Sequence, residues 1–303
     1  MPHDPLGLSA LLTTTRITAA PGEKPRDSEL DLFGLTHPGK IRKDNQDQFL
    51  VCTVHQQVVV HGTSLPDPGS LPLRGERLAT ILLVADGVGG TAVGGAASRL
   101  ATEAVTRYIA STMHTFHAAG QASEDDFRDA LRKAALEAHE TVRGETARAG
   151  IRSMATTLTI AFAVWPRLYV VQVGDSRCYF YLNGKLRQVT RDQTVAQNLV
   201  DSGALDKRDA DRSPLRNVLA SSIGGGEATP EVSVLDVSPR GAVVMLCSDG
   251  LTKHVGDAEI ATAIGRMESS EQLCRTLLEM ALQGGGSDNI TILAGRVRRA
   301  ASP

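Results

Sequence analysis

The sequence predicts an α+β fold in which antiparallel sheets are covered by helices that form separate blocks along the chain. Strand-like runs form one group before residue 86 and another after residue 157, and two helical segments lie between the groups. Because strands and helices come in blocks, this order favours antiparallel sheets over alternating βαβ units. The pair Asn183-Gly184 between two short apolar runs also predicts a type I′ hairpin.

The strand segments are recognised by alternating apolar side chains or by short apolar runs bounded by turn residues. In the clearest case, Leu158, Ile160 and Phe162 alternate with smaller side chains, which predicts one face on a core and one less apolar face. The predicted strands are residues 32–35, 48–54, 57–60, 78–85, 157–165, 168–173, 178–182, 186–189 and 289–293.

Three segments have the apolar spacing of amphipathic helices. The first covers residues 93–108, and the second covers 127–142 and is opened by Ser123 with Asp126 in the capping-box position. The third covers residues 273–281 and ends at Gly284.

Length and composition indicate one large domain with tails. We expect residues 1–29 to be a flexible leader, 30–296 a single domain and 297–303 a short tail, with a Pro-rich insertion at 61–76. The formal net charge is −2, which argues against nucleic acid as the main partner. No apolar run approaches the roughly 20 residues of a membrane span, and the four scattered cysteines indicate reduced thiols, so we expect a soluble cytoplasmic protein.

Four aspartates follow or precede apolar strand-like runs, each beside a glycine or another turn residue. Any one of them alone is most simply a turn residue. Together, however, carboxylates at the strand ends of one core point to a shared edge, where each raises the pKa of the others and a cation is needed. The four are Asp86, Asp175, Asp249 and Asp288.

No His or Cys cluster accompanies these aspartates, so a bound metal would have oxygen ligands. Oxygen ligands favour Mg²⁺ or Mn²⁺ over zinc or copper. The backbone carbonyl of Gly87 could complete the ligand set, because glycine allows close approach. A fifth carboxylate, Asp47, lies five residues after Arg42, and we expect this arginine to bind an anion beside the metal.

Two other interpretations of these motifs are weaker. Residues 87–92 fit the dinucleotide pattern G-x-G-x-x-A, but Asp86 would repel a pyrophosphate and no second βαβ strand ends in an acid about 20 residues later. Ser176 in Gly-Asp-Ser suggests a serine esterase, but the chain has no G-x-S-x-G elbow.

Six short motifs follow one another along the chain: Arg42-x-x-Asn45-Gln46-Asp47, Val84-Ala85-Asp86-Gly87-Val88-Gly89-Gly90, Ala155-Thr156-Thr157-Leu158, Val173-Gly174-Asp175-Ser176-Arg177, Cys247-Ser248-Asp249-Gly250-Leu251 and Ser287-Asp288-Asn289-Ile290-Thr291. In this order they resemble the metal-dependent protein phosphatases, the PPM or type 2C Ser/Thr phosphatases, and in particular their compact bacterial members. The resemblance covers about residues 30 to 296.

This resemblance implies a four-layer α-β-β-α sandwich, two antiparallel sheets flanked by helix pairs, with a two-metal centre in a cleft at one edge. It implies that Asp86 bridges two Mn²⁺ or Mg²⁺ ions, that Gly87 offers its carbonyl, and that Asp249 and Asp288 hold the first ion. Asp47 would support the site directly or through water.

The resemblance also assigns roles around this centre. Asp175, with Asp249, matches the pair that holds a third, weaker ion in bacterial members, and Arg42 matches the phosphate-binding arginine. Residues 195–231 match a flap beside the cleft that influences substrate choice.

The chain departs from the family pattern at four positions, none of them a core aspartate. Gln46 stands where many relatives have Glu, and Val88 stands where eukaryotic members carry a histidine proposed as general acid. Ala155 replaces the first residue of Gly-Thr-Thr, and Gln193 replaces the histidine of Asp-His-Ser.

We therefore expect a metal-dependent protein serine/threonine phosphatase that hydrolyses phosphoserine and phosphothreonine by direct attack of a metal-bridging hydroxide, with Arg42 and Asp86 as catalytic residues. Its expected partners are phosphorylated proteins and a Ser/Thr protein kinase of the same cell, without nucleic acid or membrane. The alternative, motivated by Gln46, Ala155 and Gln193, is a catalytically weak phosphoprotein-binding module on the same fold.

Overall fold

The computed structural model describes residues 23–57, 59–61, 63–64, 66, 73–89, 92–119, 123–210 and 212–298. The strands in these residues are β1 (Leu30–His37), β2 (Gln48–Gln57), β3 (Arg74–Ala85), β4 (Gly87–Val88), β5 (Ala155–Thr156), β6 (Leu158–Val164), β7 (Arg167–Val173), β8 (Arg177–Leu182), β9 (Lys185–Gln188), β10 (Glu231–Asp236), β11 (Val243–Cys247) and β12 (Ile290–Val297). The α-helices are α1 (Ala92–Ala119), α2 (Glu124–Arg148), α3 (Val195–Asp201), α4 (Lys207–Ala210), α5 (Asp249–Thr252), α6 (Asp257–Gly265) and α7 (Ser270–Gln283).

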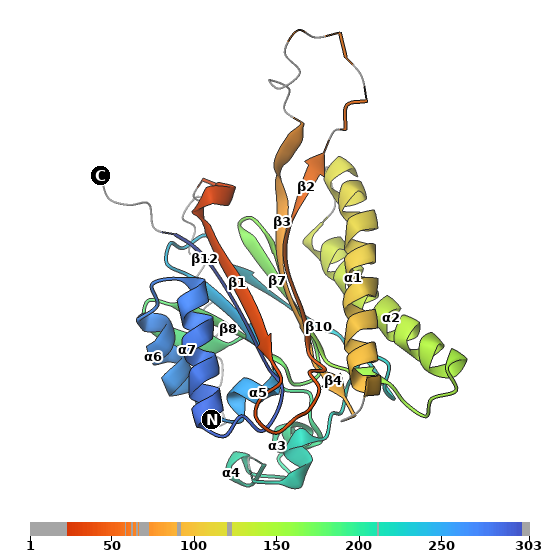
Figure 1. Ribbon diagram of the computed structural model, residues 1–303, viewed down its shortest axis with the longest axis vertical. Helices are drawn as coiled ribbons and strands as arrows, with labels where there is room; N and C mark the ends of the chain where they lie inside the picture. The colour runs from red at the N-terminus through yellow and green to blue at the C-terminus, as the bar shows by residue number, and fades with distance from the viewer. Residues whose placement is uncertain are drawn as a thin grey trace, which may run out of the picture.

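Two five-stranded antiparallel sheets stack face to face, with helices on both outer faces (Figure 1). One sheet has the order β1-β12-β11-β8-β9 and the other β10-β7-β6-β3-β2. Helices α1 and α2 cover the second sheet, whereas α6 and α7 cover the first. The predicted α-β-β-α sandwich is therefore confirmed.

Three apolar layers hold these elements together, and strand alternation explains them. In β3, Leu83 points to α1 and α2, whereas Leu82 and Val84 point to the layer between the sheets. Leu246 and Leu293 enter that middle layer from the other sheet, and both are fully buried. Because both faces of β6 are also buried, the face predicted to be less apolar packs against the first sheet instead of solvent.

Local signals in the sequence appear as expected. The Ser123 hydroxyl accepts from the Asp126 N–H at 3.1 Å, and the Ser123 N–H donates to the Asp126 carboxylate at 3.0 Å, which completes the capping box of α2. Asn183 and Gly184 both have positive φ, 51° and 79°, as a type I′ turn requires. All four cysteines are free thiols.

The structure differs from the expectations mainly at element ends. Both long helices extend beyond the predicted ranges, and β2 ends at Gln57, so the described part of 57–60 is not a separate strand. No strand or helix was predicted for β10, α6 or the flap helices α3 and α4, because their apolar repeats are short. Among the described residues, no helix combines the length and the apolar character needed to cross a bilayer.

The chain before β1 contacts the sandwich at the end where β1 begins. Arg77, which is buried, donates to the Pro25 carbonyl at 2.7 Å and to the Asp27 carboxylate at 2.5 Å. Residues 1–22 of the predicted leader, residues 62, 65 and 67–72 of the insertion at 61–76, and residues 299–303 of the tail lie outside the described residues.

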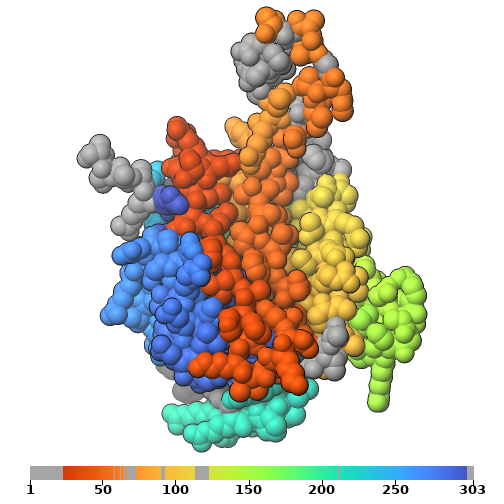
Figure 2. All heavy atoms as spheres, viewed as in Figure 1, coloured from red at the N-terminus to blue at the C-terminus, as the bar shows by residue number. Residues whose placement is uncertain are grey.

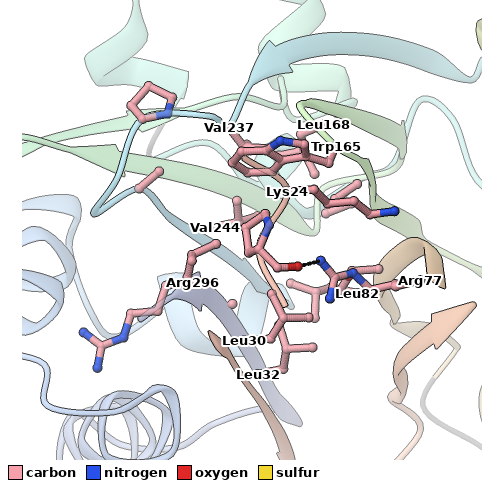
Figure 3. A pocket seen from close by; sticks show the side chains of 18 of the residues that line it. Lys24, Leu30, Leu32, Arg77, Leu82, Trp165, Leu168, Val237, Val244 and Arg296 are labelled. Atoms are coloured by element: carbon pink, nitrogen blue, oxygen red, sulfur yellow. Dashed lines mark hydrogen bonds between the residues drawn. The ribbon is translucent and has the colours of Figure 1, made fainter. Parts of the chain in front are cut away.

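A cavity of about 90 Å³ lies between the sheets at this same end. Figure 3 shows the apolar side chains that line it, among them Leu30, Trp165 and Val237. Lys24 and Pro25 also line it. The packing between the sheets is therefore less complete here than in the middle layer around Leu246 and Leu293.

We expect Leu293→Ala to destabilise the protein by about 2–5 kcal/mol, because it removes buried methyl groups between the sheets and leaves a void. The matched control is Leu136→Ala on α2, where the side chain is 42% exposed and the cost should stay within about 0.5 kcal/mol. Urea unfolding of both variants measures the difference. Equal losses would contradict the assignment of Leu293 to the middle layer.

Candidate active site

The aspartates meet at one end of the sandwich because antiparallel strands end and begin at the same edge. Asp86 follows β3, whose Ala85 pairs with Gln48 directly after Asp47. Asp249 follows β11, whose Cys247 pairs with Ile292 near the start of β12, where Asp288 lies. The pKa of Asp86 is raised well above its usual range, first by burial and then by four neighbouring carboxylates, those of Asp47, Asp249, Asp175 and Asp288.

The backbone of Asp86 is fixed by the Thr156-Thr157 pair. The Asp86 N–H donates to the Thr157 hydroxyl at 3.0 Å, and the Asp86 carbonyl accepts from the Thr157 N–H and the Thr156 hydroxyl, both at 2.8 Å. The Thr157 and Ser176 hydroxyls are hydrogen-bonded at 2.8 Å. These bonds explain why the Thr-Thr and Asp-Ser motifs accompany the aspartate, since they orient its side chain.

Only one of the two carboxylate oxygens of Asp47 accepts hydrogen bonds from the protein. Its Oδ2 accepts from the Ser248 hydroxyl at 2.8 Å and from the Thr291 hydroxyl at 2.6 Å. Its Oδ1 is buried and has no hydrogen-bond partner in the described structure. Burial is the main reason that the pKa of Asp47 is raised to about 6. A buried carboxylate oxygen without a donor is unfavourable unless a cation binds it.

Arg42 binds Asp288 across 246 residues of sequence. Its Nε and Nη2 donate to the two carboxylate oxygens at 2.8 and 2.9 Å, which is a bidentate pair. The sequence predicts that this fork binds an anion beside the metal, and in the structure its donors bind the carboxylate of Asp288. Partial burial raises the pKa of Asp288, but the hydrogen bonds from Arg42 and Lys253 outweigh it and lower the pKa overall.

Lys253, a further charged residue of the site, was not predicted from the sequence. Its Nζ lies 2.6 Å from Asp249 Oδ2 and 2.8 Å from Asp288 Oδ2. The signal was present, because Asp249 and Lys253 are four residues apart on the helical turn of α5, where such side chains meet.

Asp175 lies on a turn that two buried glutamines hold. Gly174 has φ of +103°, and a Cβ at this position would lie 2.7 Å from Thr157 Cγ2, so glycine is required. The Gly174 N–H donates to the Gln193 side chain at 2.9 Å, and the Gln172 amide donates to the Gly174 carbonyl at 2.7 Å. Burial, followed by the charge of Asp249, raises the pKa of Asp175 to about 8.

The departures from the family pattern lie outside the aspartate cluster. Gln193 links Gly174 to the flap, since its amide donates to the Thr229 carbonyl at 3.0 Å. Ala155 pairs through its backbone with Val88, whose side chain is 40% exposed. The Gln46 carbonyl accepts from the buried Ser98 hydroxyl at 2.6 Å. Gln193 therefore has a structural role through its side chain, whereas the bond at Gln46 uses the backbone carbonyl, and none of these contacts involves an aspartate side chain.

Gly87 lies where the backbone of two other segments comes close. A Cβ there would meet the Gly94 carbonyl at the start of α1 and would lie 2.8 Å from the Gln46 carbonyl. The Gly87 backbone is therefore packed between α1 and the loop that carries Asp47. This position is next to Asp86, as a backbone ligand requires.

The side chains fit a divalent cation in type and charge. Among the residues that the structure describes, no three Asp, Glu, His or Cys side chains stand ready as a group to hold a metal ion. Arg42 and Lys253 bind oxygens of Asp288 and Asp249 and offset part of the charge. The clustered carboxylates and the unpaired Oδ1 of Asp47 nevertheless form the all-oxygen set that Mg²⁺ or Mn²⁺ prefers.

The flap borders this cluster. A cavity of about 530 Å³ is lined by Asp175, Asp249 and Lys253 on one side and by flap residues that include Ala196 and Lys207 on the other. Figure 2 shows the flap, in teal, at the same end of the molecule as the red loop between β1 and β2.

Backbone hydrogen bonds join the chain segments that lead into and out of the flap helices, residues 193–195 and 218–220, which we call the neck of the flap. Val195 N–H donates to the Val218 carbonyl at 2.8 Å, and Ala220 N–H donates to the Gln193 carbonyl at 2.8 Å. The flap therefore leaves the sandwich and returns to it at nearly the same point.

This fold, with an aspartate cluster at one end of paired antiparallel sheets and an arginine beside it, defines a class of metal-dependent hydrolases. A profile described as Protein phosphatase 2C matches residues 73–284. The chain belongs to this family, and the family predicted from the sequence is confirmed.

Individual relatives agree with this assignment. The chain is 33% identical over 220 residues to the serine/threonine protein phosphatase PstP of Mycobacterium tuberculosis, which covers 72% of this chain but only 40% of that protein. It is 31% identical over 215 residues to the serine/threonine phosphatase stp of Listeria welshimeri, covering 70% of this chain and 82% of the relative.

A solved structure of the PstP catalytic domain in complex with two manganese ions has the same fold. Its TM-score is 0.65, at 26% identity over 89% of this chain and 99% of that one. Another PstP structure, from Mycobacterium tuberculosis, has a TM-score of 0.69 at the same identity and coverage. This likeness supports divalent metal as the cofactor of the family to which the chain belongs.

The raised pKa values predict how the metal-free protein responds to pH. Between the unfolded pKa of about 3.9 and the folded pKa of Asp175, about 8, the folded state binds protons that the unfolded chain has released. Its stability must therefore fall as pH rises through this range. We expect the melting temperature in EDTA to fall between pH 5 and 8, and to fall less in Asp175→Asn.

The control for this measurement is Asp209→Asn, which changes an exposed aspartate of the flap. It should follow the wild-type profile. A wild-type melting temperature that rises with pH across this range would show that the carboxylates are not clustered as described.

Proposed function

We propose that this protein is a metal-dependent protein serine/threonine phosphatase that hydrolyses phosphoserine and phosphothreonine. The observation that carries the proposal is the convergence of five aspartates, from segments far apart in sequence, around a buried carboxylate oxygen of Asp47 that has no donor. Such a set is unfavourable without divalent cations, and an arginine with a free approach from solvent stands beside it.

The residues of this site divide into ligands and a phosphate-binding group. Asp86, Asp249 and Asp288, with the Gly87 carbonyl, would hold two Mn²⁺ or Mg²⁺ ions, and Asp47 would support them. When bound, two such ions supply an activated water and neutralise the charge that develops on a phosphoryl group. No covalent phosphoenzyme is required of the chain.

Arg42 has the properties of a phosphate-binding group. Its side chain is 46% exposed while its guanidinium binds Asp288, so it lies at the border between the aspartates and solvent. A planar fork of N–H donors suits the equatorial oxygens of a phosphate monoester. We propose that Arg42 orients the substrate phosphate toward the metal ligands.

Phosphorylated proteins are the proposed substrates, and a Ser/Thr protein kinase that adds the phosphate is the proposed counterpart in the same cell. The flap cavity next to Asp175 offers room for the residues that flank a phosphorylated side chain. A cytoplasmic location, where such a kinase finds ATP, belongs to the same proposal.

The competing proposal is a phosphoprotein-binding module that has lost most of its activity. It was motivated by Gln46, Ala155 and Gln193. Gln193 has hydrogen bonds within the fold, and the aspartates are all present. These observations favour the enzyme.

Hydrolysis of p-nitrophenyl phosphate and of a phosphothreonine peptide, with and without Mn²⁺, tests the proposal. The wild type should be active only with Mn²⁺. Asp86→Asn should lose at least about 100-fold in kcat, because it removes the charge that holds both ions in place. The matched control, Asp209→Asn on the exposed flap helix α4, should keep wild-type activity.

Activity of Asp86→Asn close to the wild type would refute the metal centre. A wild type that binds Mn²⁺ and a phosphopeptide without turnover would instead favour the binding module.

A second prediction concerns Arg42. Arg42→Ala should reduce kcat/KM for the phosphopeptide by roughly 10²–10³-fold, as expected when one donor to a developing oxyanion is removed. Arg42→Lys should recover only part, because a single ammonium cannot form the fork. The exposed Arg212→Ala on the flap is the control, and an equal loss in both alanine variants would argue against a specific role.

A further inference from the structure

Lys253 lies between two of the proposed metal ligands, Asp249 and Asp288. Its side chain is only 21% exposed, and its ammonium contacts Asp249 Oδ2 at 2.6 Å and Asp288 Oδ2 at 2.8 Å. The helical turn α5 fixes the lysine relative to Asp249, because Asp249 is the first residue of this turn and Lys253 is its C-cap. The fold therefore determines the position of this ammonium within the site.

Asp175 borders the same cavity as this ammonium. Asp175, Asp249 and Lys253 line one wall of the flap cavity. The charge of Lys253 is among those that act on Asp175, where it opposes the effects of burial and of Asp249. The lysine consequently borders both members of the pair, Asp175 and Asp249, to which the family resemblance assigns a third ion.

A third divalent ion bound to Asp175 and Asp249 would compete with the ammonium of Lys253 for the carboxylate of Asp249. Lys253 already binds Asp249 Oδ2, and two cations held by the same carboxylate repel each other strongly where water is scarce. The net charge of the aspartate cluster also argues against a third divalent ion. Five carboxylates against Arg42 and Lys253 leave three negative charges, which two divalent ions already exceed.

We infer that Lys253 takes the place of the third divalent ion, so that this protein has a two-metal site with an internal ammonium beside it. The inference rests on the proposed metal-dependent phosphatase function, because it concerns the same aspartates. Under this inference Asp175 borders Lys253 and the flap cavity and holds no third ion. Lys253 is then a positioning residue for Asp249 and Asp288.

Counting bound Mn²⁺ by equilibrium dialysis, with electron paramagnetic resonance of the free ion, tests this inference up to millimolar Mn²⁺. The wild type should bind two ions. Lys253→Ala should bind a third, weaker ion, and adding Asp175→Asn to that variant should return the number to two. Lys253→Arg, which keeps the charge, and Lys207→Ala, which removes a lysine lining the same cavity, should both bind two.

A wild type that binds three ions would overturn the inference, as would Lys253→Ala that binds only two. If Lys253→Ala fails to fold, Asp175→Asn alone decides the question: it should leave the number of bound ions at two with unchanged affinities, and the loss of an ion would contradict us. A wild type that binds no Mn²⁺ would instead refute the proposed function, so the two failures are distinct.

Discussion

Repulsion among carboxylates at one end of the sandwich is the constraint on which this structure depends. Antiparallel pairing brings the ends of β3, β7 and β11 and the starts of β2 and β12 to the same edge, and an aspartate stands at each. Burial raises the free energy of their ionised forms further. The hydroxyls of Ser248 and Thr291 and the cations of Arg42 and Lys253 all lie where they reduce this repulsion.

Local patterns predicted most of the strands, the long helices and the aspartates, whereas the four layers were implied by the family resemblance. Alternation in β6, the Ser123 cap and the Asn183-Gly184 turn each involve residues within a few positions of one another. Asp86, Asp175, Asp249 and Asp288 could be selected because each follows or precedes an apolar run beside a turn residue, and Asp47 because it lies five residues after Arg42.

The partners of these aspartates could not be predicted in the same way. Arg42 and Asp288 are separated by 246 residues, and only the stacking and order of the strands determine that they meet. The bonds of Gln193 to Gly174 and Thr229 depend equally on the assembled fold, so a departure from the family pattern looked like a defect when it is a structural link.

The closed neck of the flap has an evolutionary consequence. Because residues 195 and 218 are hydrogen-bonded to each other, the intervening chain hangs from a fixed point beside the reaction centre. Insertions and exchanges within such a loop disturb the supporting framework little, while they reshape the wall of the neighbouring cavity. Gene duplicates of this chain could thus acquire new target proteins through one exchangeable segment, with the acidic centre inherited intact.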